Sequence, residues 1–158
     1  MILVTIIFVS LFATAFGSCP NNNSSITWNS KCYVYYKDAI QFNTAAYNCK
    51  NLGGDLPSIH DAFVNSLLND YVTNHVHNVF RLNFWTGGSN LFVPNTWTWM
   101  DGTAFDYTVW DIDEPRNASW ANCIGFVVPA GKWDAFDCTN KRPYFCEFPI
   151  TNSTGSQF

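Results

Sequence analysis

Residues Cys123–Phe148 have the sequence CIGFVVPAGKWDAFDCTNKRPYFCEF, and this stretch decides the fold of the C-terminal half. Two apolar and aromatic segments, Cys123–Val128 and Lys132–Cys138, flank the turn-forming sequence Pro-Ala-Gly, which predicts a β-hairpin. Tyr144–Phe148 is again rich in aromatic residues and predicts a last strand. We therefore expect the C-terminal part of the chain to be built from short strands.

The N-terminal half has the periodicity of helices, preceded by one strand. Cys32–Tyr36, CYVYY, is aromatic and β-branched and predicts that strand. Asn43–Leu52 contains good helix formers and ends at Gly53-Gly54, which predicts a helix. Ser58 and Asp61 have the spacing of a capping box and predict the start of a second helix. Its apolar residues recur on one helical face: Phe63, Val64, Leu67, Leu68, Tyr71 and Val72. Early helices and late strands indicate the α+β class.

Length and composition restrict both the architecture and the classes of partner. The chain has 158 residues, which is the size of one domain, and 18% of them are aromatic, enough to build a packed core. Lys and Arg number 8 against 12 Asp and Glu, so the formal net charge is −4. This weak acidity gives no basic surface for nucleic acid and argues against binding to anionic membranes. We expect neither as a partner.

The start of the chain has the features of a secretory signal peptide. Residues 1–16 contain no charged side chain, and this apolar run is shorter than the roughly 20 residues that span a bilayer. Ala15 and Gly17 place small side chains before Ser18, as at a signal-peptidase site. We predict a signal peptide at 1–17, one domain at 18–149 and a polar tail at 150–158. The protein would then be secreted and extracellular, without a membrane span after signal removal; the alternative is an uncleaved membrane anchor.

Six cysteines follow this segment and indicate disulfides: Cys19, Cys32, Cys49, Cys123, Cys138 and Cys146. In an oxidising compartment they would form three bonds, and fifteen pairings are open from the sequence. A zinc site is the alternative. The chain has no C-x-x-C pair, and His75 and His77 lie in a polar stretch that is typical of a solvated loop. We therefore favour disulfides.

A series of short motifs occurs in an order that is typical of one extracellular family. The motifs are LGGDLPSIH after Cys49, WTGG at 85–88, WTWMDG at 97–102, FDYTVW at 105–110, EPR at 114–116, KWDAFDC at 132–138 and YFCEF at 144–148. With them the chain resembles a C-type lectin-like domain over Cys19–Phe148, in the long form with six cysteines, as found in secreted single-domain C-type lectins.

The resemblance implies a fold and a disulfide pairing. The fold class is α+β, a C-type lectin-like fold of two helices with small antiparallel sheets, a long binding loop and three disulfides. The pairs would be Cys49 with Cys146, Cys123 with Cys138, and Cys19 with Cys32. Gly88 departs from the family, which usually has an aliphatic residue there, and we expect a thinner core at that point. Four tryptophans fall on framework positions and are expected in the core: Trp85, Trp97, Trp99 and Trp110.

The resemblance also implies a calcium-dependent sugar site, and this chain departs from it. In the family, the loop between Trp110 and Cys123 and the following strand supply oxygen ligands to a calcium ion that also binds two sugar hydroxyls. At those positions this chain keeps oxygen donors only at Glu114 and Asp134. The other ligand positions have become Arg116, Ala121 and Ala135. Because calcium takes six to eight oxygen ligands, we predict that this site is lost or greatly weakened.

Three expectations follow for the metal and the loop. We expect no cofactor; Glu114 and Asp134 remain weak candidates for a degraded calcium site, and the acid-rich Asp111 and Asp113 could build a rearranged one. Arg116 could lie between Glu114 and Asp134 and take over the electrostatic role of the ion. The peptide bond before Pro115, which is cis in calcium-binding members, is expected to be trans.

Other loop residues complete the list of candidates for ligand binding. N-glycosylation sequons begin at Asn22, Asn23, Asn117 and Asn152. A glycan on Asn117 would shield the usual sugar-binding surface. Trp120 lies off the framework and is a candidate for a surface contact. The candidate ligand-binding residues are Glu114, Arg116, Asn117, Trp120 and Asp134.

The sequence favours recognition over catalysis. His60, His75 and His77 could act as bases, but the chain lacks the G-x-S-x-G, H-E-x-x-H and glycine-rich phosphate motifs. We predict a secreted C-type lectin-like module that binds carbohydrate or an extracellular protein without the usual calcium site. The first alternative is a calcium-dependent lectin with a rearranged site; the distant one is an enzyme or toxin-like effector. The resemblance suggests adhesion or innate immunity as the setting.

Overall fold

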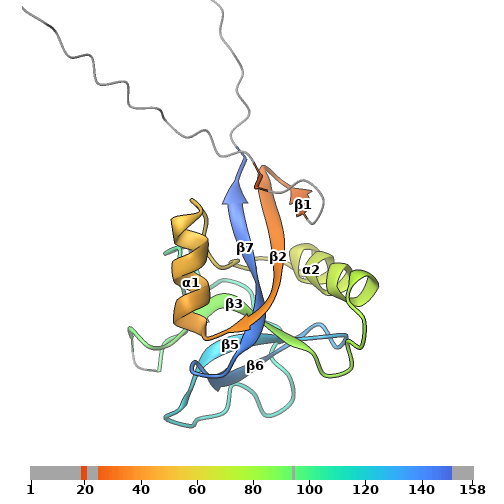
Figure 1. Ribbon diagram of the computed structural model, residues 1–158. Coiled ribbons are helices and arrows are strands. Elements are labelled where there is room, and N and C mark those ends of the chain that lie inside the picture. The colour runs from red at the N-terminus through yellow and green to blue at the C-terminus, as the bar shows by residue number, and fades with distance from the viewer. Residues whose placement is uncertain (1–18, 21–24, 94, 151–158) are drawn as a thin grey trace, which may run out of the picture.

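The computed structural model describes residues 19–20, 25–93 and 95–150 (Figure 1). The predicted signal peptide, the sequons at Asn22, Asn23 and Asn152, and the tail after Ile150 lie outside the described residues. The helices and strands, in chain order, are β1 (Ser25–Trp28), β2 (Lys31–Ile40), α1 (Phe42–Asn51), α2 (Ala62–His75), β3 (Asn83–Ser89), β4 (Thr98–Trp99), β5 (Ala121–Val127), β6 (Lys132–Asp137) and β7 (Arg142–Pro149).

The strands form one continuous sheet with the order β1-β2-β7-β3-β5-β6, and β4 pairs with β3 at the side. Neighbouring strands are antiparallel except β3 and β7, which meet as a parallel pair at Trp85 and Tyr144. Through this pair the predicted small antiparallel sheets join into one. In Figure 1, β2 and β7 run between α1 and α2, and β5 and β6 lie at the opposite end from β1. The predicted late hairpin is confirmed as β5 and β6.

Helix α1 begins and ends close to its predicted limits. Phe42, Ala45 and Cys49 form its buried face. Gly53 follows its last turn with φ +86°, the left-handed conformation in which glycine usually ends a helix. A Cβ atom on the next residue, Gly54, would lie 2.4 Å from the carbonyl oxygen of Glu147, so glycine allows the chain to pass directly against β7.

Helix α2 begins later than the sequence predicted. Its N-cap is Asp61, whose side-chain Oδ1 accepts a hydrogen bond of 2.8 Å from the Val64 amide. Ser58 lies before the helix and donates instead to Asp101, so its assignment to a capping box was wrong. On the predicted apolar face Leu68 is fully buried, but Phe63 is half-exposed and packs on Trp28.

The core fills both sides of the central sheet and includes two of the four tryptophans predicted for it. Trp85 and Trp99 are buried, whereas Trp97 and Trp110 are half-buried and pack on each other with ring centroids 5.0 Å apart. The thin core expected at Gly88 is not found. A Cβ atom there would lie 2.2 Å from Cδ1 of Ile124, because that side chain already fills the space.

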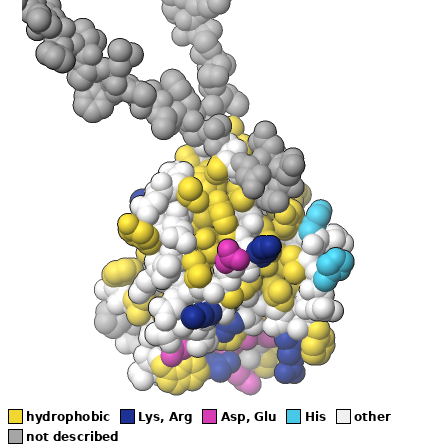
Figure 2. All heavy atoms as spheres, in the orientation of Figure 1, with side chains coloured by type: hydrophobic (Ala, Val, Ile, Leu, Met, Phe, Trp, Pro, Cys, Tyr) yellow, Lys and Arg dark blue, Asp and Glu magenta, His cyan; other side chains and the backbone are white. Residues whose placement is uncertain are grey.

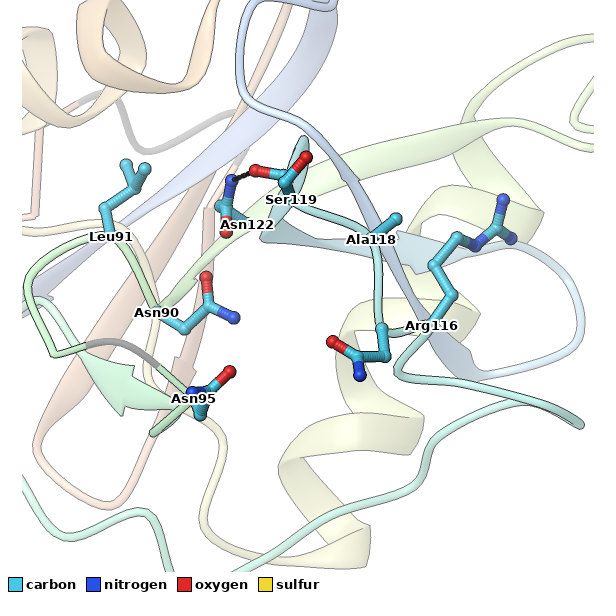
Figure 3. Close-up of a pocket in the computed structure, with 8 residues that line it drawn as sticks. Asn90, Leu91, Asn95, Arg116, Ala118, Ser119 and Asn122 are labelled. Carbon is cyan, nitrogen blue, oxygen red and sulfur yellow. Dashed lines mark hydrogen bonds between the residues drawn. The ribbon is translucent and has the colours of Figure 1, made fainter.

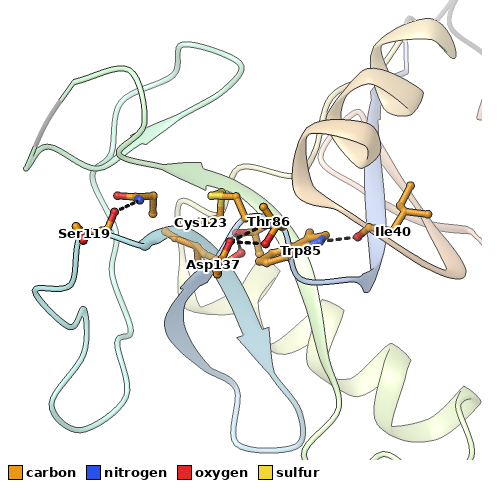
Figure 4. The surroundings of a disulfide bond; sticks show 10 residues. Ile40, Trp85, Thr86, Ser119, Cys123 and Asp137 are labelled. Carbon is orange, nitrogen blue, oxygen red and sulfur yellow. Dashed lines mark hydrogen bonds between the residues drawn. A yellow bond between two sulfur atoms is a disulfide. The ribbon is translucent and has the colours of Figure 1, made fainter.

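Three disulfides join the six cysteines in the pairs that the resemblance implied: Cys19–Cys32, Cys49–Cys146 and Cys123–Cys138. Figure 4 shows Cys123 among side chains of the central strands, where the indole of Trp85 donates a 2.9 Å hydrogen bond to the Ile40 carbonyl. Figure 2 shows apolar side chains gathered over β2 and β7 between the two helices, with histidines at the α2 edge. Within the described ranges, none of the helices combines the length and the apolar character that crossing a bilayer needs.

Candidate ligand-binding loop

The long segment between β4 and β5 is held against β6 by its own backbone. The Asp111 amide donates to the Trp133 carbonyl at 2.9 Å, and the Trp133 amide donates to the Val109 carbonyl at 3.1 Å. Trp110 and Trp133 form a parallel bridge at the same place. These bonds bring the Glu114 side chain over the backbone of Ala135, so residues 21 positions apart in sequence form one site.

Glu114 is the most completely bonded side chain of this site. Its side chain is only 4% exposed. Oε2 accepts hydrogen bonds of 3.0 Å from the amides of both Arg116 and Ala135, and Oε1 accepts from Nε of Arg116 at 2.7 Å and also from Nη2. Burial alone would raise the pKa of Glu114, but these bonds to Arg116 and Ala135 hold it below its usual value. The carboxylate is therefore ionised and fully used within the protein.

Asp134 lies nearby in the opposite situation. Its Oδ1 is buried and accepts no hydrogen bond from the described residues. Burial, together with the negative charges of Glu114 and Asp111, raises the pKa of Asp134 above its usual value. The predicted bridge by Arg116 is therefore only half correct. The guanidinium bonds Glu114, but no bond joins it to Asp134 within the described residues. Its Cζ atom lies 5.7 Å from the ring centroid of Trp120.

The peptide bond between Glu114 and Pro115 is cis, so the expected trans bond was wrong. That expectation made the cis form depend on a metal ion at Glu114. In this loop, N–H groups of Arg116 and Ala135 instead donate hydrogen bonds to both oxygens of that carboxylate. Glu114 therefore has protein N–H groups as its partners in this loop.

The neighbouring acids do not gather into a metal-binding group. Within the described ranges, three or more His, Cys, Asp or Glu side chains converge nowhere as a metal cluster would. Asp111 uses one oxygen to accept from the Ile112 amide at 2.8 Å. Ala121 and Ala135, at two positions where the family has ligands, are buried methyl groups.

A polar recess of about 420 Å³ adjoins the loop, and we call it the amide recess. Figure 3 shows that its walls come from two segments, one that follows β3 and one that leads into the start of β5, with Asn90 and Asn95 on the first, and that the Arg116 side chain points away from the space between them. Its lining residues are Asn90, Leu91, Asn95, Arg116, Asn117, Ala118, Ser119 and Asn122. Of the predicted ligand-binding residues it includes Arg116 and Asn117, while Trp120 is half-exposed beside Arg116.

The amide recess was missed by sequence reasoning. Asn90 and Asn122 lie 32 positions apart, and polar residues in loops are too common to mark a site by themselves. In the structure the backbone amide of Asn90 donates to the backbone carbonyl of Asn122 at 3.1 Å, and this bond joins the two walls.

A second polar cluster contains His60 but does not have the properties of a catalytic centre. His60 Nδ1 lies 2.7 Å from Asp106 Oδ1, and its Nε2 lies 3.1 Å from the Ser58 hydroxyl oxygen. This is the atom order of a serine-hydrolase triad. The Ser58 side chain is buried, however, and its hydroxyl donates to Asp101 Oδ2 at 2.7 Å. A hydroxyl that is inaccessible and bonded to a carboxylate is poorly placed to attack a substrate.

The other two histidines lie at the end of α2. His75 Nδ1 lies 2.9 Å from the Tyr71 carbonyl, and its ring stacks on the Tyr71 ring at 4.5 Å. His77 lines a separate groove of about 560 Å³ together with Tyr35 and Tyr36. These contacts give the histidines roles in packing and surface shape.

Comparison with known proteins agrees with the fold. The family model described as the Lectin C-type domain matches residues 38–148. The chain is 26% identical to Lectin BRA-3 of Megabalanus rosa over 92% of this chain and 88% of that protein. It is 30% identical to C-type lectin lectoxin-Lio1 of Erythrolamprus poecilogyrus over 92% of this chain and 91% of that protein.

Solved structures agree with the same fold. The C-type carbohydrate-recognition domain of cow CD23, determined in the presence of a GlcNAc2Man3 oligosaccharide, is 29% identical with a TM-score of 0.70, over 86% of this chain and 99% of that one. A calcium-independent type II antifreeze protein is 25% identical with a TM-score of 0.72, over 85% of this chain and 97% of that one.

Proposed function

The chain belongs to the Lectin C-type domain family, and we propose that it is an extracellular recognition module that binds its ligand without calcium. The ligand would contact the surface formed by β6 and the long segment between β4 and β5, which we call the loop face. The ligand would be a glycan or an extracellular protein. The observation that carries this proposal is the bonding of Glu114, whose two oxygens already accept from Arg116 and Ala135.

The residues present do not fit a calcium ion. Calcium prefers six to eight oxygen donors, several of them charged. Here Glu114 is saturated by N–H donors, Arg116 contributes positive charge, and Ala135 offers only a methyl group. An incoming ion would have to displace the guanidinium and gather ligands that the described loop does not supply. We infer that Arg116 replaces the ion in organising this loop.

The comparisons support the class of function and the plausibility of a calcium-free site. One structural neighbour is described as a carbohydrate-recognition domain and another as a calcium-independent protein of the same fold. The alternative is a calcium-dependent lectin that uses Asp111 and Asp113. Asp113 is exposed and Asp111 bonds the loop backbone, so this arrangement would need a rearranged loop.

Secretion and glycosylation form part of the proposal. Residues 1–17 would direct the chain out of the cell, and Asn117, which is exposed, would be a glycosylation site. The Ser58 cluster gives no support to the enzymatic alternative, because its hydroxyl is buried and bonded to Asp101. We therefore propose a recognition protein that is not an enzyme.

Binding with and without calcium tests the proposal directly. The secreted protein would be applied to panels of glycans and of extracellular proteins, in millimolar calcium and in excess chelator, with calorimetric titration of calcium in parallel. We expect at least one ligand whose binding is equal in both buffers, and no calcium binding at millimolar concentrations. Binding that disappears in chelator would favour the rearranged-site alternative, and absence of any ligand would contradict the proposal.

A further inference from the structure

His60 lies where the segment before α2 meets the long loop between β4 and β5, and its ring has polar neighbours at both nitrogens. Nδ1 lies 2.7 Å from Asp106 Oδ1. Nε2 lies 3.1 Å from the hydroxyl oxygen of Ser58 and 3.2 Å from that of Thr103. A neutral imidazole has one N–H group and one bare nitrogen, whereas the imidazolium has two N–H groups. The partners of the two nitrogens therefore indicate which form the structure contains.

The contact with Asp106 requires a hydrogen on Nδ1. Asp106 is ionised at neutral pH, because its bond with His60 holds the pKa of this carboxyl below its usual value. An ionised carboxylate can only accept a hydrogen bond. The ring nitrogen that approaches its oxygen to 2.7 Å must therefore donate, so Nδ1 of His60 carries a hydrogen.

The two hydroxyl groups require a second hydrogen, on Nε2. Ser58 Oγ lies 2.7 Å from Asp101 Oδ2, and Thr103 Oγ1 lies 2.6 Å from Asp101 Oδ1. Burial opposes ionisation of Asp101, but bonds from Thr103 and Ser58 lower its pKa, so both hydroxyls donate to an ionised carboxylate. Each hydroxyl has a single hydrogen, and none is left for His60. Nε2 must then be the donor, because a bare nitrogen there would face two oxygen lone pairs.

The charges around the ring favour the same form. Among the described neighbours of His60, four are acids and one is a base. The acids are Asp101 and Asp106 in the long loop, Asp61 at the start of α2 and Glu147 in β7, and the base is Lys31 in β2. Lys31 is paired with Glu147, and Tyr33, which lines the same small cavity as His60, is neutral because burial raises its pKa. The surroundings of His60 are thus suited to a positive charge.

We propose that His60 is doubly protonated at neutral pH and forms a pH-dependent link between the long loop and the segment before α2. With both N–H groups present, every hydrogen of the network has an acceptor. Loss of the hydrogen on Nε2 would leave this nitrogen facing the oxygens of Ser58 and Thr103 without a bond. The link is therefore present while the ring is charged and is lost as the pH rises through the titration of His60.

This inference goes beyond the proposed function, since it concerns how firmly the long loop is held and involves no ligand. It also gives a second reason why the cluster is not catalytic, because a doubly protonated imidazole cannot act as a base. The low pKa values of Asp101 and Asp106 keep the acceptors ionised on the acid side of neutrality. The loop should consequently be held more firmly in mildly acidic than in alkaline solution.

The first experiment determines the protonation state by NMR of the ring nitrogens. In the imidazolium the two 15N signals lie close together, whereas in the neutral ring the bare nitrogen has a very different shift. The 15N-labelled secreted protein would be recorded at pH 7.5, where a histidine with the ordinary pKa of about 6.5 is mostly neutral. His60→Gln identifies the signals of His60. We expect the imidazolium pattern for His60, and a neutral pattern at this pH would overturn the inference.

The second experiment follows the loop by hydrogen exchange between pH 6 and pH 9, corrected for the intrinsic rate. The amides of Gly102 and Thr103 report on the loop because both donate hydrogen bonds, to the Trp99 carbonyl and to Asp101 Oδ1. We expect their protection to fall by about threefold or more across this range, the size of a partly exposed ion pair, while the β5–β6 hairpin stays unchanged. Equal protection at both pH values in the parent protein would contradict the proposed link.

Matched variants assign the effect to His60. His60→Gln should remove the pH dependence of loop protection. Asp106→Asn keeps an acceptor on an exposed residue but removes its charge, so loosening should begin at lower pH than in the parent. Asp70→Asn, at an exposed carboxylate of α2, is the control and should keep the parent profile. A parent-like profile in His60→Gln, or in Asp106→Asn should His60→Gln fail to fold, would refute the inference and leave the proposed function standing.

Discussion

At the scale of single residues, the loop face contains two carboxylates in opposite electrostatic situations. Glu114 accepts hydrogen bonds from Arg116 and Ala135 that hold its pKa below the usual value in spite of burial. Asp134 has a buried oxygen without a partner among the described residues, and burial raises its pKa. One carboxylate should therefore stabilise the folded protein at neutral pH, and the other should destabilise it.

We predict that Asp134→Asn stabilises the protein at neutral pH. A raised folded pKa means that the ionised form is disfavoured by folding, so the gain is complete above the folded pKa and disappears below the unfolded value of about 3.9. Denaturant unfolding across this pH range measures it. Asp137→Asn on the same strand is the control with the opposite sign, because bonds from the Thr139 amide and hydroxyl lower the pKa of Asp137. Equal effects of the two changes would contradict the electrostatic explanation.

We predict that Arg116→Gln increases amide exchange in the loop and raises the pKa of Glu114. Without the guanidinium, burial is opposed only by backbone donors, so the pKa of Glu114 should rise. The loss of stability should not exceed about 1 kcal/mol because Arg116 is 46% exposed. Since the parent pKa is lowered, that loss is present at neutral pH and vanishes once Glu114 is protonated. NMR titration and amide exchange of residues 111–118 measure both effects. Arg81→Gln, at another exposed arginine, is the control, and unchanged exchange in Arg116→Gln would contradict the ordering role.

At the scale of elements, the segment before α2 is joined to the long loop by a group of polar contacts, of which the Ser58–Asp101 bond is partly buried. Ser58 donates to Asp101 Oδ2, and Asp101 Oδ1 accepts from the Thr103 amide and hydroxyl. Burial opposes ionisation of Asp101, yet these bonds lower its pKa below the usual value. His60 connects the same cluster to Asp106 at 2.7 Å. These contacts attach loop residues 101–106 to residues 58–60, which precede α2 and lie about 40 positions earlier in the chain.

We predict that Ser58→Ala destabilises the protein by about 1–3 kcal/mol, the usual cost of removing a buried hydrogen bond to a charged group. The change should also increase amide exchange at Thr103, since that residue shares Asp101 with Ser58. Ser66→Ala, an exposed serine in α2, is the matched control and should have little effect. If both substitutions change the unfolding free energy equally, the Ser58–Asp101 bond does not anchor the loop.

The elements that sequence reasoning found are those whose signals are local. The end of α1 at Gly53 and the β5–β6 hairpin depend on residues within a few positions of one another, so pattern and turn chemistry were sufficient. Ser58 was misassigned because its S-x-x-D spacing to Asp61 is local, whereas its bond to Asp101 spans 43 positions. The amide recess was missed for the same reason, since Asn90 and Asn122 meet only in the folded chain.

At the scale of the whole molecule, the fold depends on contacts between distant segments. β2 pairs with β7, so the start of the domain lies beside its end, and α1 packs at this pair through Cys49 and Cys146. Fifteen disulfide pairings were open from the sequence alone, and only the family resemblance selected the one that the structure contains. The resemblance also indicated which positions to compare with the calcium ligands of the family, but the hydrogen bonding of Glu114 could not be predicted, because it requires Ala135 on β6.

We predict that the disulfide between Cys49 and Cys146 contributes the most stability of the three. It spans 97 positions, against 15 for Cys123–Cys138 and 13 for Cys19–Cys32. In the loop-closure treatment, the Cys49–Cys146 bond raises the free energy of the unfolded chain by about 4.7 kcal/mol, and each of the other two bonds raises it by about 3 kcal/mol. Each pair would be replaced by alanines and unfolded in denaturant, with the Cys19–Cys32 variant as the matched control. Since Cys49 also joins α1 to β7, its variant should unfold at the lowest denaturant concentration. A Cys49→Ala, Cys146→Ala protein as stable as this control would show that strand pairing, and not the covalent link, holds the two ends of the domain together.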